Sequence, residues 1–307
     1  MSAADVEDKR ELLHQPLHGI YIPVALVIFG TAVIDYRYIP YVLIPLVLLI
    51  GVRAYSAYNR RASISADSWR SLELVDKTII SRDTAIYRFQ LIRADEILQI
   101  PVGHHLATKF EDSTEVRYYT PISSNTEEGF FDILVKSYAD GDVSKKFGGL
   151  NPGQFVQFKG PVGRFNYVTN HVKKLGMIAG GSGITPILKV ISEIVTTPED
   201  QTEISIIYAN KTENDILLFD ELNQFAAKYP NFTINYTLET PEAGWTGDVG
   251  YITKEMVEKH LPAPSDDVRI LICGPQGLKK LATEITEELG FTPAKMPSKG
   301  DDQVFVF

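Results

Sequence analysis

The sequence predicts an α+β chain with an N-terminal membrane anchor, a six-stranded antiparallel barrel and then an α/β domain built on a parallel sheet. Three observations predict this fold class. Two uncharged apolar stretches lie near the N-terminus, six short strand-like runs follow without helices alternating between them, and strands then alternate with helices. A chain of 307 residues has room for both domains and the anchor.

The anchor is predicted from two apolar stretches, residues 19–34 and 38–52, which the polar triplet DYR separates. A membrane span needs about 20 apolar residues, so each stretch is slightly short. The sequence favours a cytosolic leader over residues 1–18 and an anchor over residues 19–55, folded as a two-helix hairpin of about 19–35 and 38–55. Membrane lipid is therefore an expected partner.

Two other arrangements of the anchor were weighed. One is a single span over residues 38–54, with the earlier stretch lying on the membrane surface. The other is a cleavable signal peptide, which fits less well because the apolar zone starts late, follows an acidic leader and is too long. The hairpin keeps the basic residues of both flanks on one side, and the positive-inside rule makes that side cytosolic.

The middle of the chain predicts a small all-β domain. A polar linker is expected over residues 56–68 and the barrel over residues 69–168. Turn signals such as EDST and NTEEG separate the strand-like runs. The six runs cover residues 72–81, 86–92, 105–110, 116–123, 130–138 and 154–160.

The remainder, residues 169–307, alternates apolar strands such as LGMIA and EISIIYAN with helical segments such as TPILKVISEIV. This alternation predicts βαβ units and a parallel sheet, whose ligands bind at the carboxyl ends of the strands.

Composition narrows the classes of function. The charged and apolar fractions are those of a globular protein. A net charge of −9 argues against a nucleic-acid partner, because phosphate backbones attract basic surfaces. A single cysteine, Cys273, excludes an internal disulfide framework. His104 and His105 would face opposite sides of a strand, so no metal site is expected.

Two glycine-rich turns predict a nucleotide site in the α/β domain. In GMIAGGSGITP, Gly180, Gly181 and Gly183 let the backbone approach a ligand, and the helix that follows directs its amide groups at an anion. In ICGPQ, a later strand ends at Cys273. That cysteine is either a small buried apolar residue or part of a wall beside a nicotinamide ring, together with Gly274 and Pro275, and its place at a strand end favours the wall.

The stretch EVRYYTPISS in the barrel is unusually polar for a strand. It is either a solvated edge strand that Pro121 ends or the bed of a flat, charged cofactor. Its RYYTPIS segment, GGSGITP and CGP, in this order, resemble the motifs of the ferredoxin–NADP reductase superfamily. The NADH–cytochrome b5 reductase branch is the most similar, in its fungal, membrane-anchored form. The resemblance covers roughly residues 69–307 and includes PVGHH, LVKSY and the final DQVFVF.

The resemblance implies that the tyrosine-rich strand holds FAD. Arg117 would bind the FAD pyrophosphate, since a planar guanidinium contacts phosphate at two points. Tyr119 would stack along the isoalloxazine, Thr120 would place its catalytic hydroxyl by the hydride-accepting nitrogen, and Ser123 would complete the bed. Tyr118 should face away, because side chains alternate along a strand.

The resemblance assigns further FAD contacts outside this strand. The LVKSY strand would contribute backbone contacts from Val135 and Lys136, with Tyr138 near the ribityl chain, although a plain barrel strand is an equal reading for Val135. The first amides of a short helix would meet the pyrophosphate, and Thr185 would reach the flavin from the other domain. Those amides belong to Asp142, Val143 and Ser144.

The nicotinamide nucleotide is expected to be NADH. Glu239 falls at the carboxyl end of the strand FTINYTLE, where its carboxylate could accept hydrogen bonds from an adenosine ribose and repel the extra phosphate of NADPH. An ordinary solvated glutamate is the alternative. Cys273 is the second residue expected at the reaction centre, beside the nicotinamide.

The implied activity is an NADH-dependent FAD reductase on a membrane, with its catalytic domains facing the cytosol. Cytochrome b5 is the first expected acceptor and a membrane quinone the alternative, while an inactive scaffold is disfavoured by the intact motifs. Asp142 stands where animal members often carry lysine, which weakens the case for an acidic haem protein. Four lysines, Lys145, Lys146, Lys173 and Lys174, could form a basic patch or be ordinary solvated lysines. The endoplasmic reticulum is the first candidate membrane, before the plasma membrane and the mitochondrial outer membrane.

Overall fold

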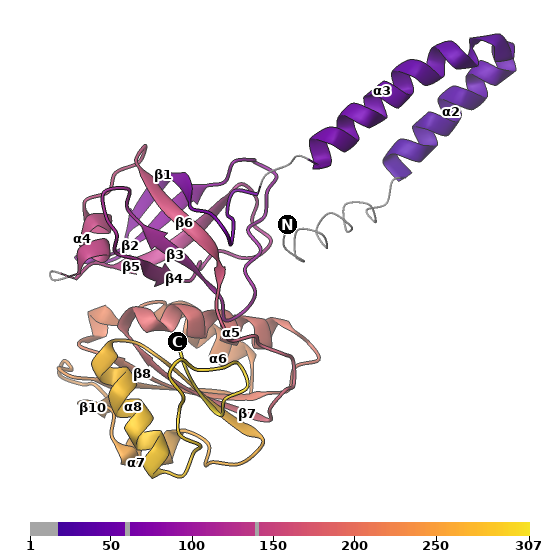
Figure 1. The fold of residues 1–307 in the computed structure, drawn as a ribbon. Helices are drawn as coiled ribbons and strands as arrows, with labels where there is room; N and C mark the ends of the chain where they lie inside the picture. The colour runs from indigo at the N-terminus through magenta and orange to yellow at the C-terminus, as the bar shows by residue number, and fades with distance from the viewer. Residues whose placement is uncertain (1–17, 59–61, 139–140) are drawn as a thin grey trace. The chain divides into compact units, whose positions relative to one another are not determined.

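The computed structural model describes residues 18–58, 62–138 and 141–307. The chain divides into two compact units, Met1–Ala62 and Ser63–Phe307. The first unit contains helices α2 (His18–Asp35) and α3 (Ile39–Tyr58), joined by the short 3-10 turn η1 (Tyr36–Tyr38). The two helices lie side by side (Figure 1). At the turn between them, the Asp35 carboxylate accepts a hydrogen bond of 2.9 Å from the backbone of Arg37. The expected leader lies outside the described residues, apart from His18.

The helical segment Val24–Val52 has the length and apolar composition of a membrane span, and none of its most apolar stretch is buried within the protein. Large apolar side chains such as Phe29, Ile34 and Leu48 are well exposed on it. An apolar surface of this kind on a soluble chain would be a liability, whereas lipid would cover it.

The second unit begins with an antiparallel sheet in the order β4-β3-β6-β1-β2-β5. A bridge between Pro121 and Ile133 connects the β4 end of the sheet to β5, which closes the barrel. Helix α4 (Asp142–Gly148) contributes Phe147, whose ring contacts Tyr87, Phe89 and Phe110 in the barrel core. The strands are β1 (Arg70–Ile79), β2 (Thr84–Gln90), β3 (His105–Lys109), β4 (Arg117–Tyr119), β5 (Phe130–Lys136) and β6 (Phe155–Val162).

The barrel unit starts earlier in the chain than Trp69, within the expected linker. Ser63 and Ile64 are buried. Ser63 donates its backbone N–H and its hydroxyl to the two carboxylate oxygens of Glu96, at 2.7 and 2.6 Å. The same hydroxyl accepts a bond from the backbone of Ile92. The chain is therefore fixed to the barrel immediately after the first unit.

The second sheet is parallel throughout, in the order β10-β9-β8-β7-β11-β12. Helices α5 and α6 share one apolar core with the sheet, and α7 and α8 share the other, so the sheet is covered on both faces. This is the α/β domain expected from the alternating pattern. Its strands are β7 (Lys174–Gly180), β8 (Glu203–Asn210), β9 (Phe232–Leu238), β10 (Asp248–Val249), β11 (Val268–Cys273) and β12 (Val304–Val306). Its helices are α5 (Ile184–Thr196), α6 (Phe219–Lys228), α7 (Lys254–His260) and α8 (Gln276–Glu288), with 3-10 turns η2 (Gly181–Gly183) and η3 (Glu213–Asp215).

Candidate functional site

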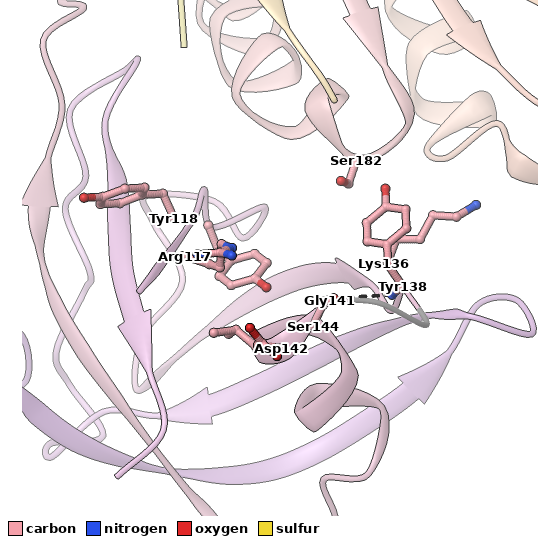
Figure 2. A pocket seen from close by; sticks show the side chains of 10 residues that line it. Arg117, Tyr118, Lys136, Tyr138, Gly141, Asp142, Ser144 and Ser182 are labelled. Carbon is pink, nitrogen blue, oxygen red and sulfur yellow. Dashed lines mark hydrogen bonds between the residues drawn. The ribbon is translucent and has the colours of Figure 1, made fainter. Parts of the chain in front are cut away.

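A first cavity of about 210 Å³ lies where the polar strand β4, the end of β5 and the start of α4 meet turn η2 (Figure 2). Two domains therefore contribute to it, the barrel with most of the lining and the α/β domain with Ser182. The lining residues are Arg117, Tyr118, Tyr119, Lys136, Tyr138, Gly141, Asp142, Val143, Ser144 and Ser182.

Strand β4 supplies one wall of this cavity. Arg117 is half exposed and donates to the Glu115 carboxylate at 2.9 Å, so its guanidinium can exchange this partner for a phosphate. The Tyr119 ring packs edge-on against Phe147, and burial raises the pKa of its hydroxyl, which stays protonated. Tyr118 is exposed and its ring packs against His105 on the neighbouring strand, although the residue is also part of the lining of the cavity.

The start of α4 supplies the opposite wall. The Ser144 hydroxyl accepts a bond from the backbone of Tyr138, and the Ser144 carbonyl accepts one from Ser137, which ties the helix to the end of β5. A Cβ atom on Gly141 would lie 2.2 Å from the Ser144 hydroxyl, so a larger residue would displace this hydroxyl and its bond to Tyr138. A guanidinium, an aromatic ring and a cluster of backbone amides thus border one space, which suits the pyrophosphate and ring of a flavin nucleotide.

Four of the expected FAD residues are not in the lining of this cavity. Val135 is fully buried in the barrel core, so that only its backbone can face a ligand. Thr120 and Thr185 are buried, and the Thr185 hydroxyl donates to the carbonyl of Ser182 at 3.2 Å. The Ser123 hydroxyl accepts a bond from the backbone of Asp132. Their contacts with FAD remain predictions.

The two glycine-rich turns pack against each other. A Cβ atom on Gly183 would lie 2.5 Å from the carbonyl oxygen of Cys273 and 2.7 Å from the Cα of Gly274, which leaves no room for a side chain. A Cβ atom on Gly180 would lie 2.6 Å from Leu278 on α8. Burial raises the pKa of the Cys273 thiol to about 12, so the thiol is protonated at neutral pH and is not a nucleophile.

A second cavity, of about 510 Å³, lies at the carboxyl ends of the parallel strands. Glu239 directly follows β9 and is in its lining, together with Gly180, Gly181 and Pro275. Lys136 and Tyr138 line both cavities, so the two spaces adjoin at these side chains. An elongated dinucleotide in the second cavity can therefore bring one end next to a flavin in the first.

Several lining residues were missed by the sequence reasoning. Ser182 occupies the variable position of the glycine-rich motif. Asn210 is buried at the end of β8 and lines the second cavity, where neither atom of its side-chain amide has a hydrogen-bond partner within the described part of the chain. Lys211 follows it on the same rim. The strand-end rule that selected Glu239 would have found both residues, had it been applied to every strand.

In the ranges that the structure describes, no three His, Cys, Asp or Glu side chains come together in a group that could hold a metal ion.

Comparison with known proteins matches two domain families. Residues 71–167 match the model of the oxidoreductase FAD-binding domain, and residues 177–284 match that of the oxidoreductase NAD-binding domain. The matched segments coincide with the barrel and the parallel sheet, and so with the two cavities.

Individual relatives agree with these families. The chain is 53% identical to the plasma membrane-associated coenzyme Q6 reductase PGA3 of Saccharomyces cerevisiae, over 100% of both chains. It is 43% identical to NADH-cytochrome b5 reductase 1 of Ajellomyces capsulatus, over 95% of this chain and 97% of that protein. Among solved structures, the cytochrome b5 reductase domain of Ulva prolifera nitrate reductase superposes with a TM-score of 0.73 at 32% identity. That match covers 80% of this chain and all of that domain.

The two adjoining cavities, the two matched domains and the full-length relatives agree with one another. The chain belongs to the NADH-cytochrome b5 reductase family of the ferredoxin–NADP reductase superfamily, and it is an FAD- and NADH-dependent oxidoreductase.

Proposed function

We propose that this protein is a membrane-anchored NADH dehydrogenase that passes its electrons to a membrane quinone. The overall reaction takes NADH, a proton and a quinone to NAD⁺ and a quinol. The observation that carries the choice of acceptor is the 53% identity to a coenzyme Q6 reductase over the whole of both chains, anchor included. Bound FAD supplies the redox chemistry, by accepting a hydride and releasing the electrons.

The chain's own residues bind and orient the two nucleotides. Arg117 and the first amides of α4 hold the FAD pyrophosphate, and Tyr119 lies along the flavin ring. Thr120 and Thr185 approach the flavin from the barrel and from α5. Glu239 accepts hydrogen bonds from the adenosine ribose of NADH. The two turns that pack together at Gly183 and Cys273 form the wall beside the nicotinamide. Cys273 acts there through its position and not as a thiolate.

The surface charge supports a quinone better than an acidic haem protein. Of the four lysines of the candidate basic patch, Lys146 pairs with Asp112 at 2.6 Å, Lys173 with Asp267 at 2.5 Å and Lys174 with Glu203 at 2.9 Å. These carboxylates neutralise the positive field that would steer an acidic partner. A neutral quinone dissolved in lipid needs no such field.

The first unit supports the location at a membrane. Its apolar side chains are exposed, and helices α2 and α3 lie side by side around a polar turn. We assign them to a membrane hairpin that leaves the catalytic domains in the cytosol. Because the yeast relative is named as plasma membrane-associated, the plasma membrane is a candidate location for this protein, as are the endoplasmic reticulum and the mitochondrial outer membrane.

Cytochrome b5 is the second candidate acceptor, because relatives named NADH-cytochrome b5 reductase 1 are 40–43% identical over most of this chain. The decisive experiment places the full-length, FAD-loaded protein in liposomes. NADH oxidation is then measured with a short-chain quinone and with soluble cytochrome b5, side by side. We expect kcat/KM to be at least about tenfold higher for the quinone, a difference of about 1.4 kcal/mol.

Three outcomes contradict the quinone proposal. A reversed ratio would assign cytochrome b5 as the acceptor, and equal efficiencies would remove any basis for choosing the quinone. A colourless protein that takes up no FAD would favour an inactive scaffold. Protein treated to remove FAD is the control for non-enzymatic quinone reduction by NADH.

A further inference from the structure

Lys189 connects the two catalytic domains. It lies on helix α5, in the α/β domain, and its ammonium group donates to the backbone carbonyl of Ser123 at 2.6 Å. A second, longer bond of 3.3 Å reaches the side-chain oxygen of Asn125. Both acceptors belong to the barrel, in the loop that follows the flavin strand β4. Ser123 was expected at the flavin site from the sequence, whereas Lys189 was not.

The acceptor loop is itself held by the barrel. Ser123 accepts through its hydroxyl from the backbone of Asp132, and the backbone of Ile122 donates to the Asp132 carbonyl at 2.8 Å. Asp132 in turn forms a two-point ion pair with Arg88, at 2.9 and 2.8 Å. Ser123 therefore forms hydrogen bonds both with the barrel and with Lys189 of the other domain. It lies three residues after Thr120 in the sequence.

Helix α5 is equally tied to the nucleotide site. It begins at Ile184, directly after turn η2, and Thr185 lies in its first turn. Thr185 and Lys189 are four residues apart, so they lie on the same face of the helix. One face of one helix therefore carries both Thr185, which is expected to reach the flavin, and Lys189, which binds the loop behind the flavin strand.

A stabilising ion pair does not account for the presence of a lysine at position 189. Its ammonium makes no ion pair within 4.0 Å among the described residues, and burial lowers its pKa, while the charges of Glu127 and Glu193 oppose that shift. Apolar residues surround the interface, with Leu134 buried in the core that α5 shares and Ile122 packed against it. An apolar side chain in place of Lys189 would relieve the cost of burying a charge but would lose the hydrogen bond to Ser123, so the two effects on stability oppose each other. What the ammonium provides is a directed hydrogen bond.

We propose that Lys189 is a positioning residue, which sets the distance and register between the flavin strand β4 and the nicotinamide-side turn η2. Hydride transfer needs the donor and acceptor atoms in near-contact, and a displacement of about 1 Å can lower a rate about 100-fold. The apolar contacts of the interface hold the domains together but are not directional. The bond from Lys189 to Ser123 is directional, and it ends close to Thr120.

The test uses the FAD-loaded Lys189→Met protein, which keeps the length and apolar stem of lysine but cannot donate. We expect unchanged FAD content and an unfolding temperature within about 4 °C of the wild type. The limiting rate of flavin reduction by NADH, in anaerobic stopped flow, should fall about 10- to 100-fold, with little change in the NADH concentration that gives half of that rate. Backbone hydrogen exchange should become faster in the segment containing residues 121–127.

Two further variants make the test specific. Lys189→Arg keeps a cationic donor and should recover most of the lost rate. Lys280→Met removes the same charge from α8, where the side chain is 76% exposed, and should match the wild type. A wild-type rate in Lys189→Met would overturn the proposal. So would a rate loss that follows loss of FAD or of thermal stability, or a loss that Lys189→Arg does not recover, since each indicates a general structural role.

Discussion

Lys136, on strand β5 of the FAD-binding domain, forms an ion pair with Asp215, on turn η3 of the NAD-binding domain. The two side chains are only 11% and 24% exposed, and Asp83 lies 3.5 Å from the same ammonium group. Burial opposes the charge on Lys136, but the hydrogen bond that its ammonium donates to Asp215 and the charges of the two carboxylates outweigh this effect and raise the pKa of Lys136. The pair joins the two domains at the point where both cavities meet.

The first prediction follows from the burial of this pair. Among the described residues, Asp215→Asn leaves Lys136 paired with Asp83 alone, so a partly buried charge loses its best partner. We expect the free energy of unfolding to fall by about 1–3 kcal/mol, measured by urea denaturation. Asp267→Asn breaks the ion pair with Lys173 on the surface, where Lys173 is 78% and Asp267 57% exposed. Because water screens this pair, its loss should destabilise the protein clearly less. Equal losses in the two variants would contradict the prediction.

The second prediction concerns Arg117. Replacement by alanine removes the cationic donor beside the first cavity, so the FAD pyrophosphate loses a charge-assisted hydrogen bond of roughly 1.5–3 kcal/mol. FAD affinity should fall about tenfold to a hundredfold, as measured by fluorescence titration of the FAD-free protein. Arg82→Ala, at an exposed turn of the same domain, is the matched control. Full FAD retention by the Arg117 variant after dilution and gel filtration would remove Arg117 from the site.

The third prediction concerns the choice between NADH and NADPH. Glu239→Thr should weaken NADH binding by roughly 1.5–3 kcal/mol through the lost hydrogen bond, and should raise the use of NADPH because a repulsive charge is gone. Catalytic efficiency for both nucleotides is measured with a small artificial acceptor. Glu242→Thr, in the turn that follows, does not line the cavity and should leave the ratio unchanged. An unchanged NADH-to-NADPH ratio in the FAD-loaded Glu239 variant would refute the assignment.

The fourth prediction concerns pH. Burial, and secondarily the charge of His104, lowers the pKa of His105 to about 4 from its usual 6.5. Between these values the unfolded chain binds a proton at this position and the folded chain does not, so stability should decrease as the pH falls from about 6.5 towards 4. We expect a contribution of roughly 1–3 kcal/mol over this window. The urea midpoints at pH 7 and pH 5 should therefore differ less in His105→Gln than in the wild type, and the same pH dependence in both proteins would contradict the prediction.

The fifth prediction concerns the membrane hairpin. A single tilted span over residues 19–52 would bury Asp35 and Arg37, at roughly 2.5–3.5 kcal/mol each near a helix centre. A hairpin instead places both at the far surface. Tags at the N-terminus and the C-terminus should therefore both be cut by protease outside sealed vesicles with the cytosolic side outward. Protection of the N-terminal tag alone would support one span in its place.

Local sequence patterns were sufficient for the architecture. The six barrel strands and the parallel sheet follow from short-range periodicity, and the glycines of the two turns follow from the close backbone approach that they permit. Glu239 lies on the rim of a cavity because strand ends of a parallel sheet share one edge. The polar strand was predicted to be longer than the observed β4, because the hydroxyls and aromatic rings of YYTPIS continue past the point where regular pairing ends.

Contacts between distant segments were not predictable in the same way. Ser63 looks like a linker residue in the sequence, and only its bonds to Glu96, 33 positions away, reveal that it belongs to the barrel. Lys189 follows an ordinary amphipathic pattern on α5, and its acceptor, Ser123, lies 66 positions earlier in another domain. Such contacts depend on how separately folded segments pack against each other, and the local spacing of apolar and polar residues carries no information about that packing.

The attachment of Ser63 to the barrel has a consequence for how the enzyme meets its acceptor. The unit Ser63–Phe307 has its own apolar cores and contains both cavities, so we expect its chemistry not to depend on α2 and α3. A tether to a membrane would raise the effective concentration of the enzyme relative to an acceptor that is confined to lipid, because both are held at the same surface. Cleavage before Ser63 would leave the hydride step intact, and encounters with a lipid-dissolved acceptor would become the slow step.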